Sequence, residues 1–203
     1  MNLVSICHPD GVLELSILGF LAAGPLPGHE LRRRITHLTG YSRPVSDGTL
    51  YPAINRLTKA GLILRRPAPE AGGGRYVLNL TDTGREDMLR RLREPAEHEL
   101  TDLPRWFTIL AFLSLLPDVA DQHAVLRRRL AFLEESASFF YDGETPLRAD
   151  EVTDPYRRGM LLIARATSQA ERTWIRESLG QDAPEPGPTR DPHASSPLDP
   201  SAS

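Results

Sequence analysis

Hydrophobic residues recur at steps of three and four in three short stretches of the first sixty residues, which places them on one face of a helix. The first predicted helix covers residues 13–23, the second lies between Pro27-Gly28 and Gly40, and the third covers residues 46–60. Each stretch is followed by a glycine, which commonly ends a helix. The apolar positions, in chain order, are Leu13, Ile17, Leu18 and Leu21, then Leu31, Ile35 and Leu38, then Leu50, Ile54 and Leu57.

The period then changes from helical spacing to alternation. Residues 62–66 and 75–80 have the pattern of β-strands, and the segment 67–74 between them is rich in proline and glycine, which predicts a hairpin. Either Thr81 or Thr83 begins the next helix, the latter with a glutamate three residues later, as in a capping box. Three helices followed by a hairpin is the order of a winged helix-turn-helix domain.

The second half of the chain has no strand pattern and predicts helices over about residues 103–116, 119–141 and 154–179. In the last two, apolar residues recur in steps of three and four, which suits helix packing of the coiled-coil type. Each seam spans only about two heptads, so its partner helix lies either in the same chain or in a second copy. The seam positions are Leu126, Leu130, Leu133 and Phe140 in one helix, and Ile163, Ala170 and Trp174 in the other.

Charge is distributed unevenly along the chain, although the net charge is only −3. Residues 1–93 contain 13 Lys and Arg against 8 Asp and Glu, whereas residues 94–203 contain 11 against 19. The N-terminal half is therefore the half that could meet a polyanion such as DNA.

The third predicted helix carries the candidate chemistry, because the second helix of a helix-turn-helix pair enters the major groove of DNA. Its apolar face docks on the first two helices and leaves a polar edge outside. On that edge, Asn55 has an amide that can pair with adenine, and Arg56 can grip guanine or a phosphate. The polar edge comprises Thr49, Tyr51, Asn55, Arg56 and Lys59, and the helix N-terminus near Ser46 suits a phosphate oxygen.

The predicted wing adds Arg65, Arg66 and Arg75 around its glycine-rich tip. Such a tip lies along the DNA backbone or in the minor groove, or its glycines form no more than a turn. The alternative for the polar helix edge is that its side chains only face water, as charged side chains usually do.

Three blocks of the chain resemble the PadR family of bacterial transcriptional regulators: LELSILGFLAAGPLPGHELRRRI, VSDGTLYPAINRLTKAGLI and GGGRYVLNLTDTG. In that family a leucine-rich first helix leads to a Pro-x-x-Gly-Tyr-Glu-Leu turn and a Ser-x-Gly-Thr-Leu-Tyr-Pro recognition helix. A wing then leads into Leu-Thr-x-x-Gly. The resemblance covers about residues 13–85, and one departure is visible: His29 stands where the family usually has tyrosine.

The resemblance implies a dimeric winged helix repressor, often released from DNA by a small and frequently aromatic ligand. Its partners would be double-stranded DNA with a palindromic operator, a second copy of the chain, and a small aromatic or hydrophobic effector, with no cofactor. Aromatic residues of the second half either wall an effector pocket or pack in the core. Ser46, Thr49 and Tyr51 match the family's DNA-facing positions, and Gly48, Leu50 and Pro52 match its structural positions.

The predicted fold class is mainly α with a small β-hairpin. We expect an N-terminal arm over residues 1–12, a winged helix-turn-helix domain over 13–93 and a helical dimerisation domain over 94–180. A tail over residues 181–203, dominated by Pro, Ser, Asp and Ala, is expected to be disordered.

Other classes of protein fit the sequence less well. The six histidines are scattered without a zinc-protease, nucleophile-elbow or phosphate-loop motif, so we expect neither an enzyme nor a metal site. Cys7 is the only cysteine, which excludes an intrachain disulfide. No apolar run is long enough for a membrane span, so we expect a cytoplasmic protein. The remaining alternative is a winged helix that binds another protein and not DNA.

Overall fold

A computed structural model of the chain describes residues 10–38, 45–67, 76–135, 141–142 and 144–180. The chain divides into two compact units, residues 1–137 and 138–203. The first contains helices α1 (Asp10–Ala22), α2 (Gly28–Leu38), α3 (Asp47–Lys59), α4 (Asp82–Arg93), α5 (Glu97–Thr101), α6 (Leu103–Phe112) and α7 (Val119–Glu134), the 3-10 helix η1 (Leu113–Leu115), and strands β1 (Ile63–Pro67) and β2 (Tyr76–Leu80). The second contains β3 (Tyr141–Asp142), β4 (Thr145–Pro146) and α8 (Pro155–Ser178). The mainly helical fold with a hairpin is confirmed, while the predicted domain limits at residues 12, 93 and 180 stay predictions.

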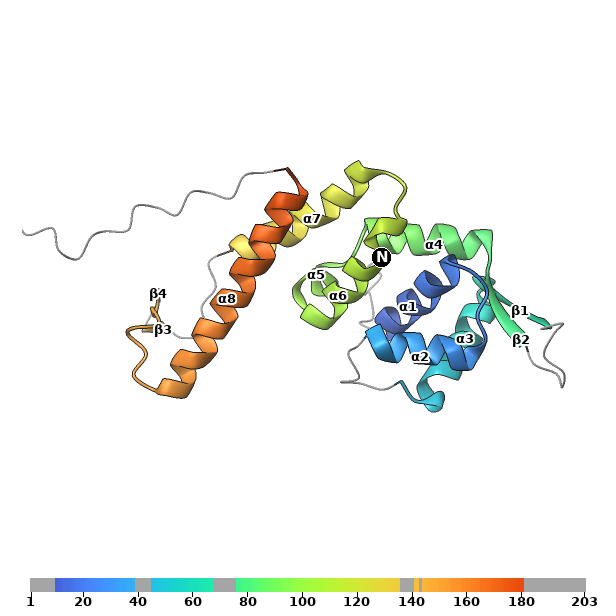
Figure 1. The fold of residues 1–203 in the computed structure, drawn as a ribbon, viewed down its shortest axis with the longest axis horizontal. Helices are drawn as coiled ribbons and strands as arrows, with labels where there is room; N and C mark the ends of the chain where they lie inside the picture. Colours follow the sequence, from blue (N-terminus) through green and yellow to red (C-terminus); the bar gives the residue numbers. More distant parts are fainter. Residues whose placement is uncertain (1–9, 39–44, 68–75, 136–140, 143, 181–203) are drawn as a thin grey trace, which may run out of the picture. The chain divides into compact units, whose positions relative to one another are not determined.

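Helix α1 is the centre of the first unit, and α2, α3, α4, α6 and β2 all contact it (Figure 1). Because elements pack around it, α1 buries more of its surface than the single apolar face that the sequence predicted. Leu15 and Ser16 are buried in addition to Ile17, Leu18 and Leu21. The buried Ser16 hydroxyl is hydrogen-bonded within the helix, because its Oγ donates to the Val12 carbonyl at 2.8 Å.

The wing is an antiparallel hairpin in which Ile63 lies opposite Leu80 and Pro67 opposite Tyr76. The linker between α1 and α2 pairs with strand β2 of this hairpin at a single residue, Leu26. Leu26 N–H donates to the Leu78 carbonyl at 3.1 Å, and Leu78 N–H donates back to Leu26 at 2.8 Å. This bridge was not predicted, because its two residues lie far apart in the sequence.

Helix α4 begins at Thr81, the first of the two predicted candidates, whose Oγ1 accepts from Gly84 N–H at 2.9 Å. Thr81 Oγ1 and Thr81 N–H also donate to the Leu62 carbonyl, at 3.0 and 3.1 Å. A Cβ on Gly84 would lie 2.0 Å from that same carbonyl oxygen. The glycine of the Leu-Thr-x-x-Gly motif is therefore required because α4 begins against the entry to β1.

Two helix ends predicted for the second half were wrong, and one short helix was not predicted. The helix predicted over residues 103–116 ends at Phe112 and continues as the 3-10 turn η1, and the short helix α5 before it was not predicted. The helix predicted over 119–141 ends at Glu134. The predicted helices were too long, because apolar residues at steps of three and four mark one face of a helix and do not mark where it ends.

The statement that the second half lacks strands was also wrong. Tyr141 pairs with Pro146 and Asp142 with Thr145 in a two-stranded hairpin. The glycine at position 143 is a turn signal in the sequence, but two-residue strands carry almost no alternation that would mark them as strands. Helix α8 agrees with the prediction for residues 154–179, and the Asp154 carboxylate caps it by accepting from the backbone N–H groups of Tyr156 and Arg157.

Candidate nucleic-acid interface

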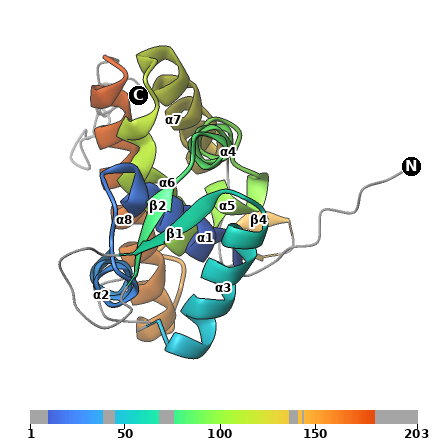
Figure 2. The same cartoon turned by 90° about the vertical axis from the view of Figure 1, so that its right-hand side faces the viewer.

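Helix α3 separates apolar and polar side chains as the sequence predicted. Leu50, Ile54 and Leu57 are at most 2% exposed, and Ala53 joins them in the core. The side chains left outside are Ser46, Thr49, Tyr51, Asn55, Arg56 and Lys59. The hairpin β1–β2 lies next to this helix, and β1 contacts it directly (Figure 2). The two predicted DNA-facing elements therefore adjoin one another.

Side chains at the N-terminus of α3 contact one another and α2. Ser46 occupies the N-cap position but its side chain makes no capping bond; its Oγ lies 3.0 Å from Thr49 Oγ1 instead. The carboxylate of Asp47 in the first turn would repel a phosphate, but it forms an ion pair with Arg32 of α2 at 2.8 Å. The ion pair reduces the repulsion that a phosphate would meet here, and the phosphate site at this helix N-terminus stays a prediction.

Tyr51 lies at the junction of α2 and α3. Its side chain is 37% exposed, and a Cβ on Gly28 would lie 3.5 Å from its hydroxyl oxygen and ring edge. The ring therefore rests over the beginning of α2 while still facing outward, so Tyr51 is held in place by contact with a neighbouring helix.

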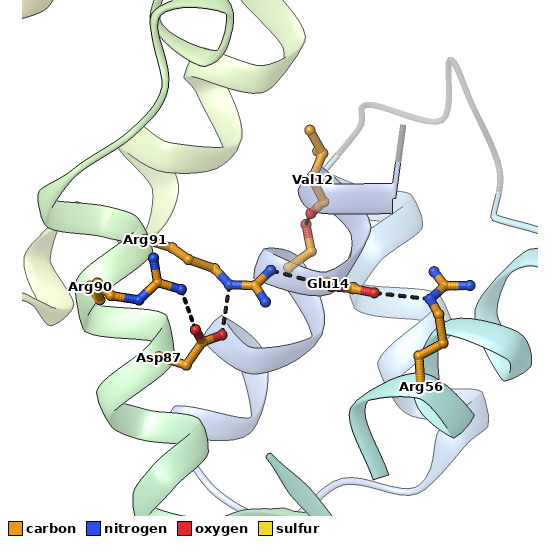
Figure 3. A network of polar contacts seen from close by, with 7 residues as sticks. Val12, Glu14, Arg56, Asp87, Arg90 and Arg91 are labelled. Atoms are coloured by element: carbon orange, nitrogen blue, oxygen red, sulfur yellow. Dashed lines mark hydrogen bonds and ion pairs between the residues drawn. The ribbon is translucent and has the colours of Figure 1, made fainter. Parts of the chain in front are cut away.

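Arg56 is bound to the scaffold of the domain (Figure 3). Its Nε donates to Glu14 Oε1 of α1 at 3.1 Å, and Arg91 of α4 donates from Nη1 to Glu14 Oε2 at 3.3 Å. Arg91 Nε also donates to Asp87 Oδ2 at 2.7 Å, and Arg90 pairs with the same carboxylate. One carboxylate on α1 thus links α3 to α4.

Glu14 is the residue that the sequence analysis missed. It is the only charged residue in the predicted helix over 13–23, and its side chain is only 16% exposed. A lone carboxylate within an apolar helix requires a partner when it is buried, and that signal was available in the sequence. The Arg56 side chain remains 45% exposed beside it.

Arg65 on strand β1 contacts helix α3. Arg65 Nη2 donates to Asn55 Oδ1 at 2.5 Å, and its guanidinium carbon lies 5.0 Å from the centroid of the Tyr76 ring. The side chains of Lys59 and Arg66 are exposed and have no hydrogen-bonding or ionic partner within the described part of the chain. The predicted contact residue Arg75 lies outside the described residues.

Helix α2 contributes less free positive charge than its three consecutive arginines suggested. Besides the pair between Arg32 and Asp47, Arg33 and Arg34 both bind the Glu30 carboxylate at 2.9 Å. Hydrogen bonds from Arg34 and then Arg33 lower the pKa of Glu30 below its ordinary value of 4.5. The basic character of the face therefore comes mainly from α3 and the wing.

The residues predicted for dimerisation fall into two classes. Leu126 and Leu130 of α7 are only 4% and 6% exposed, and Leu133 is half-buried. In contrast, Ile163 is 70% and Trp174 44% exposed on α8, with Ala170 exposed between them. Phe140 lies outside the described residues.

Over the described ranges, no three His, Cys, Asp or Glu side chains gather as metal ligands would. None of the helices described there combines the length and the apolar character that crossing a bilayer requires.

Known proteins that are similar to parts of this chain include transcriptional regulators. Residues 17–90 match the model of the transcriptional regulator PadR-like family. A transcriptional regulator from Clostridium thermocellum is 28% identical in a match that covers 45% of this chain and 86% of that one, with a TM-score of 0.39. No curated protein matches the chain significantly.

Bacillus subtilis PadR in complex with operator DNA is 20% identical, over 85% of this chain and 99% of that one, with a TM-score of 0.39. The same protein in complex with p-coumaric acid is 20% identical, over 85% and 96%, with a TM-score of 0.36. The matched residues run from within α1, through α2, α3 and the hairpin, into α4. Residues 17–90 of this chain are similar to the PadR-like family of transcriptional regulators.

Proposed function

We propose that this protein is a sequence-specific DNA-binding transcriptional regulator that acts in the bacterial cytoplasm as a homodimeric repressor. The observation that carries the proposal is the outer face of α3. Its side chains combine hydroxyl, phenol, amide and cationic groups beside a basic wing, while its inner face is buried in the domain core.

The chemistry of that face suits double-stranded DNA. Tyr51 and Asn55 offer donors and acceptors for base edges, and Lys59 offers a cation for a phosphate. Arg66 extends the positive charge along the wing, where a backbone contact is expected. Arg56 fits a phosphate contact better than a base contact, because its Nε is already bound to Glu14.

Substitutions on α3 test the DNA-binding proposal. Tyr51→Ala should weaken binding to the operator far more than binding to a scrambled duplex, whereas Lys59→Ala should weaken both alike and reduce the salt dependence. Arg127→Ala, which removes one exposed charge from α7, is the matched control and should change neither. Equal loss for both duplexes in Tyr51→Ala would contradict base reading by this helix.

Dimerisation is proposed through α8. Its 24 residues carry a stripe at steps of four and three that is exposed along its whole length. An exposed stripe of this kind is typical of a long helix that packs against a helix of another chain. The stripe comprises Tyr156, Met160, Ile163, Thr167, Ala170 and Trp174. Two copies joined in this way would present two recognition helices to half-sites about 34 Å apart.

Sedimentation velocity tests the α8 interface. Ile163→Asp places a charge in the middle of the stripe and should convert a dimer into a monomer. Arg158→Asp changes an exposed residue on the opposite side of α8 and should leave the dimer intact. A wild-type protein that sediments as a monomer at micromolar concentration would refute the interface.

Release by a small aromatic or hydrophobic ligand completes the proposal and follows from the motif resemblance. Trp106 supports it, because its Nε1 is a buried donor with no hydrogen-bond partner in the described part of the chain. The guanidinium of the buried Arg129 lies 5.4 Å from the Trp106 ring centroid. A ligand screen for loss of operator binding tests this step, and it fails if no compound shifts the affinity.

A further inference from the structure

Three residues from three different elements of the wing and recognition helix contact one another in series. The Tyr76 ring on β2 lies 5.0 Å from the guanidinium carbon of Arg65 on β1. Arg65 Nη2 in turn donates to Asn55 Oδ1 on α3 at 2.5 Å. These contacts connect the hairpin to the one carboxamide on the outer face of α3.

The chemistry of this contact fixes which way the Asn55 amide points. A guanidinium carries only donors, so the atom that faces Arg65 has to be the oxygen of the amide. The amide nitrogen then points elsewhere, and rotation by half a turn would bring two sets of donors together. Arg65 therefore selects one of the two orientations that an exposed asparagine otherwise samples freely.

A fixed orientation bears directly on base reading. Asparagine recognises adenine through a bidentate pair in which the oxygen accepts from N6 and the nitrogen donates to N7. A carboxamide oxygen has two lone pairs, so the bond from Arg65 leaves one for the base. An amide that is already oriented loses less conformational freedom on binding than a mobile one.

We propose that Tyr76 and Arg65 are positioning residues through which the wing sets the base discrimination of Asn55, with adenine as the base read. The proposal rests on the proposed DNA-binding function and deepens it. In this role Arg65 affects which base the protein prefers. A wing arginine is otherwise expected only to attract the phosphates of the DNA backbone, whatever the sequence. Tyr76 acts through its ring face, which holds the guanidinium in place.

The test is a set of affinities for the operator and for duplexes in which each base pair is changed singly. Asn55→Ala should lower discrimination at one base pair by roughly 5- to 100-fold. Arg65→Ala should lower discrimination at that same base pair, and the double variant should lose no more than Asn55→Ala alone. Tyr76→Phe keeps the ring and should behave as wild type, whereas Tyr76→Leu should relax the preference in part.

Arg66→Ala is the matched control, because Arg66 is the next wing arginine and is also exposed. It should lower affinity for every duplex by the same factor and leave the preference unchanged. Should Arg65→Ala fail to fold, Arg65→Lys keeps the charge but loses the planar fork, and it should still relax the preference.

Two outcomes would overturn the proposal in distinguishable ways. If Arg65→Ala lowers affinity uniformly, as Arg66→Ala does, then Arg65 is only a phosphate contact and the positioning role is wrong. If wild-type protein binds its operator no better than a scrambled duplex, the proposed function itself fails, and the role built on it fails with it.

Discussion

Replacing Gly84 by alanine should destabilise the protein, although Gly84 lies in the first turn of a helix where alanine is normally preferred. Helix propensity alone predicts a gain of up to about 1 kcal/mol for this substitution. The new Cβ, however, would lie 2.0 Å from the Leu62 carbonyl oxygen and 2.9 Å from Leu80 Cδ1. The Leu62 atom belongs to the backbone, so it cannot rotate away as a flexible side chain would.

The expected loss in the free energy of unfolding can be worked out from the displacement of α4 away from Leu62. Overpacking of a tight contact costs about 1–3 kcal/mol, and moving α4 away also weakens the two bonds from Thr81 to Leu62, each worth about 1 kcal/mol. After the propensity gain is subtracted, the net loss should be about 2–4 kcal/mol.

Urea denaturation followed by circular dichroism measures the loss, at one fixed protein concentration because an oligomer's stability depends on it. Gly159→Ala in α8 is the matched control, since nothing lies within 4 Å of the corresponding Cβ. That control should be neutral or stabilising by up to about 1 kcal/mol. A Gly84→Ala protein as stable as wild type would refute the steric argument.

Three further predictions test other parts of the structure. Glu14→Gln removes the charge that binds Arg56 and should cost roughly 1–2 kcal/mol after discounting for solvent exposure; an unchanged melting temperature in calorimetry would contradict it. Glu30 has a lowered pKa, so its stabilising contribution is complete above its ordinary value of 4.5 and is lost as the pH falls through the lowered pKa; a carboxyl NMR titration at or above 4.5 would argue against this. Gly19→Ala places a Cβ 2.6 Å from the Phe112 ring and should cost less in a Phe112→Leu background, whereas additive costs in a double-mutant cycle would disprove the contact.

The first half of the fold could be predicted because its signals are local. Helical spacing marked the core positions Leu50, Ile54 and Leu57, and alternation marked the hairpin. Glycines and a threonine cap then marked where helices begin and end. The bridge of Leu26 to Leu78 could not be predicted in this way, because it joins segments about fifty residues apart in sequence.

The polar face of α3 could be predicted as a set of exposed residues, but not the partners of its members. Arg56 and Asn55 are adjacent in the chain and both exposed, yet one binds Glu14 of α1 and the other binds Arg65 of β1. Those contacts depend on how helices and strands are placed in three dimensions, which side-chain spacing along one helix does not encode. The short hairpin β3–β4 was missed because two-residue strands carry almost no alternation.

The central claim is that this protein recognises a specific DNA sequence, and fluorescence anisotropy tests it most directly. The wild-type protein would be titrated against a duplex from immediately upstream of its own gene and against a scrambled duplex, at two salt concentrations. We predict tighter binding to the upstream duplex and a steep loss of affinity at the higher salt. No binding to either duplex, even at low salt, would contradict the claim and favour a winged helix that binds another protein.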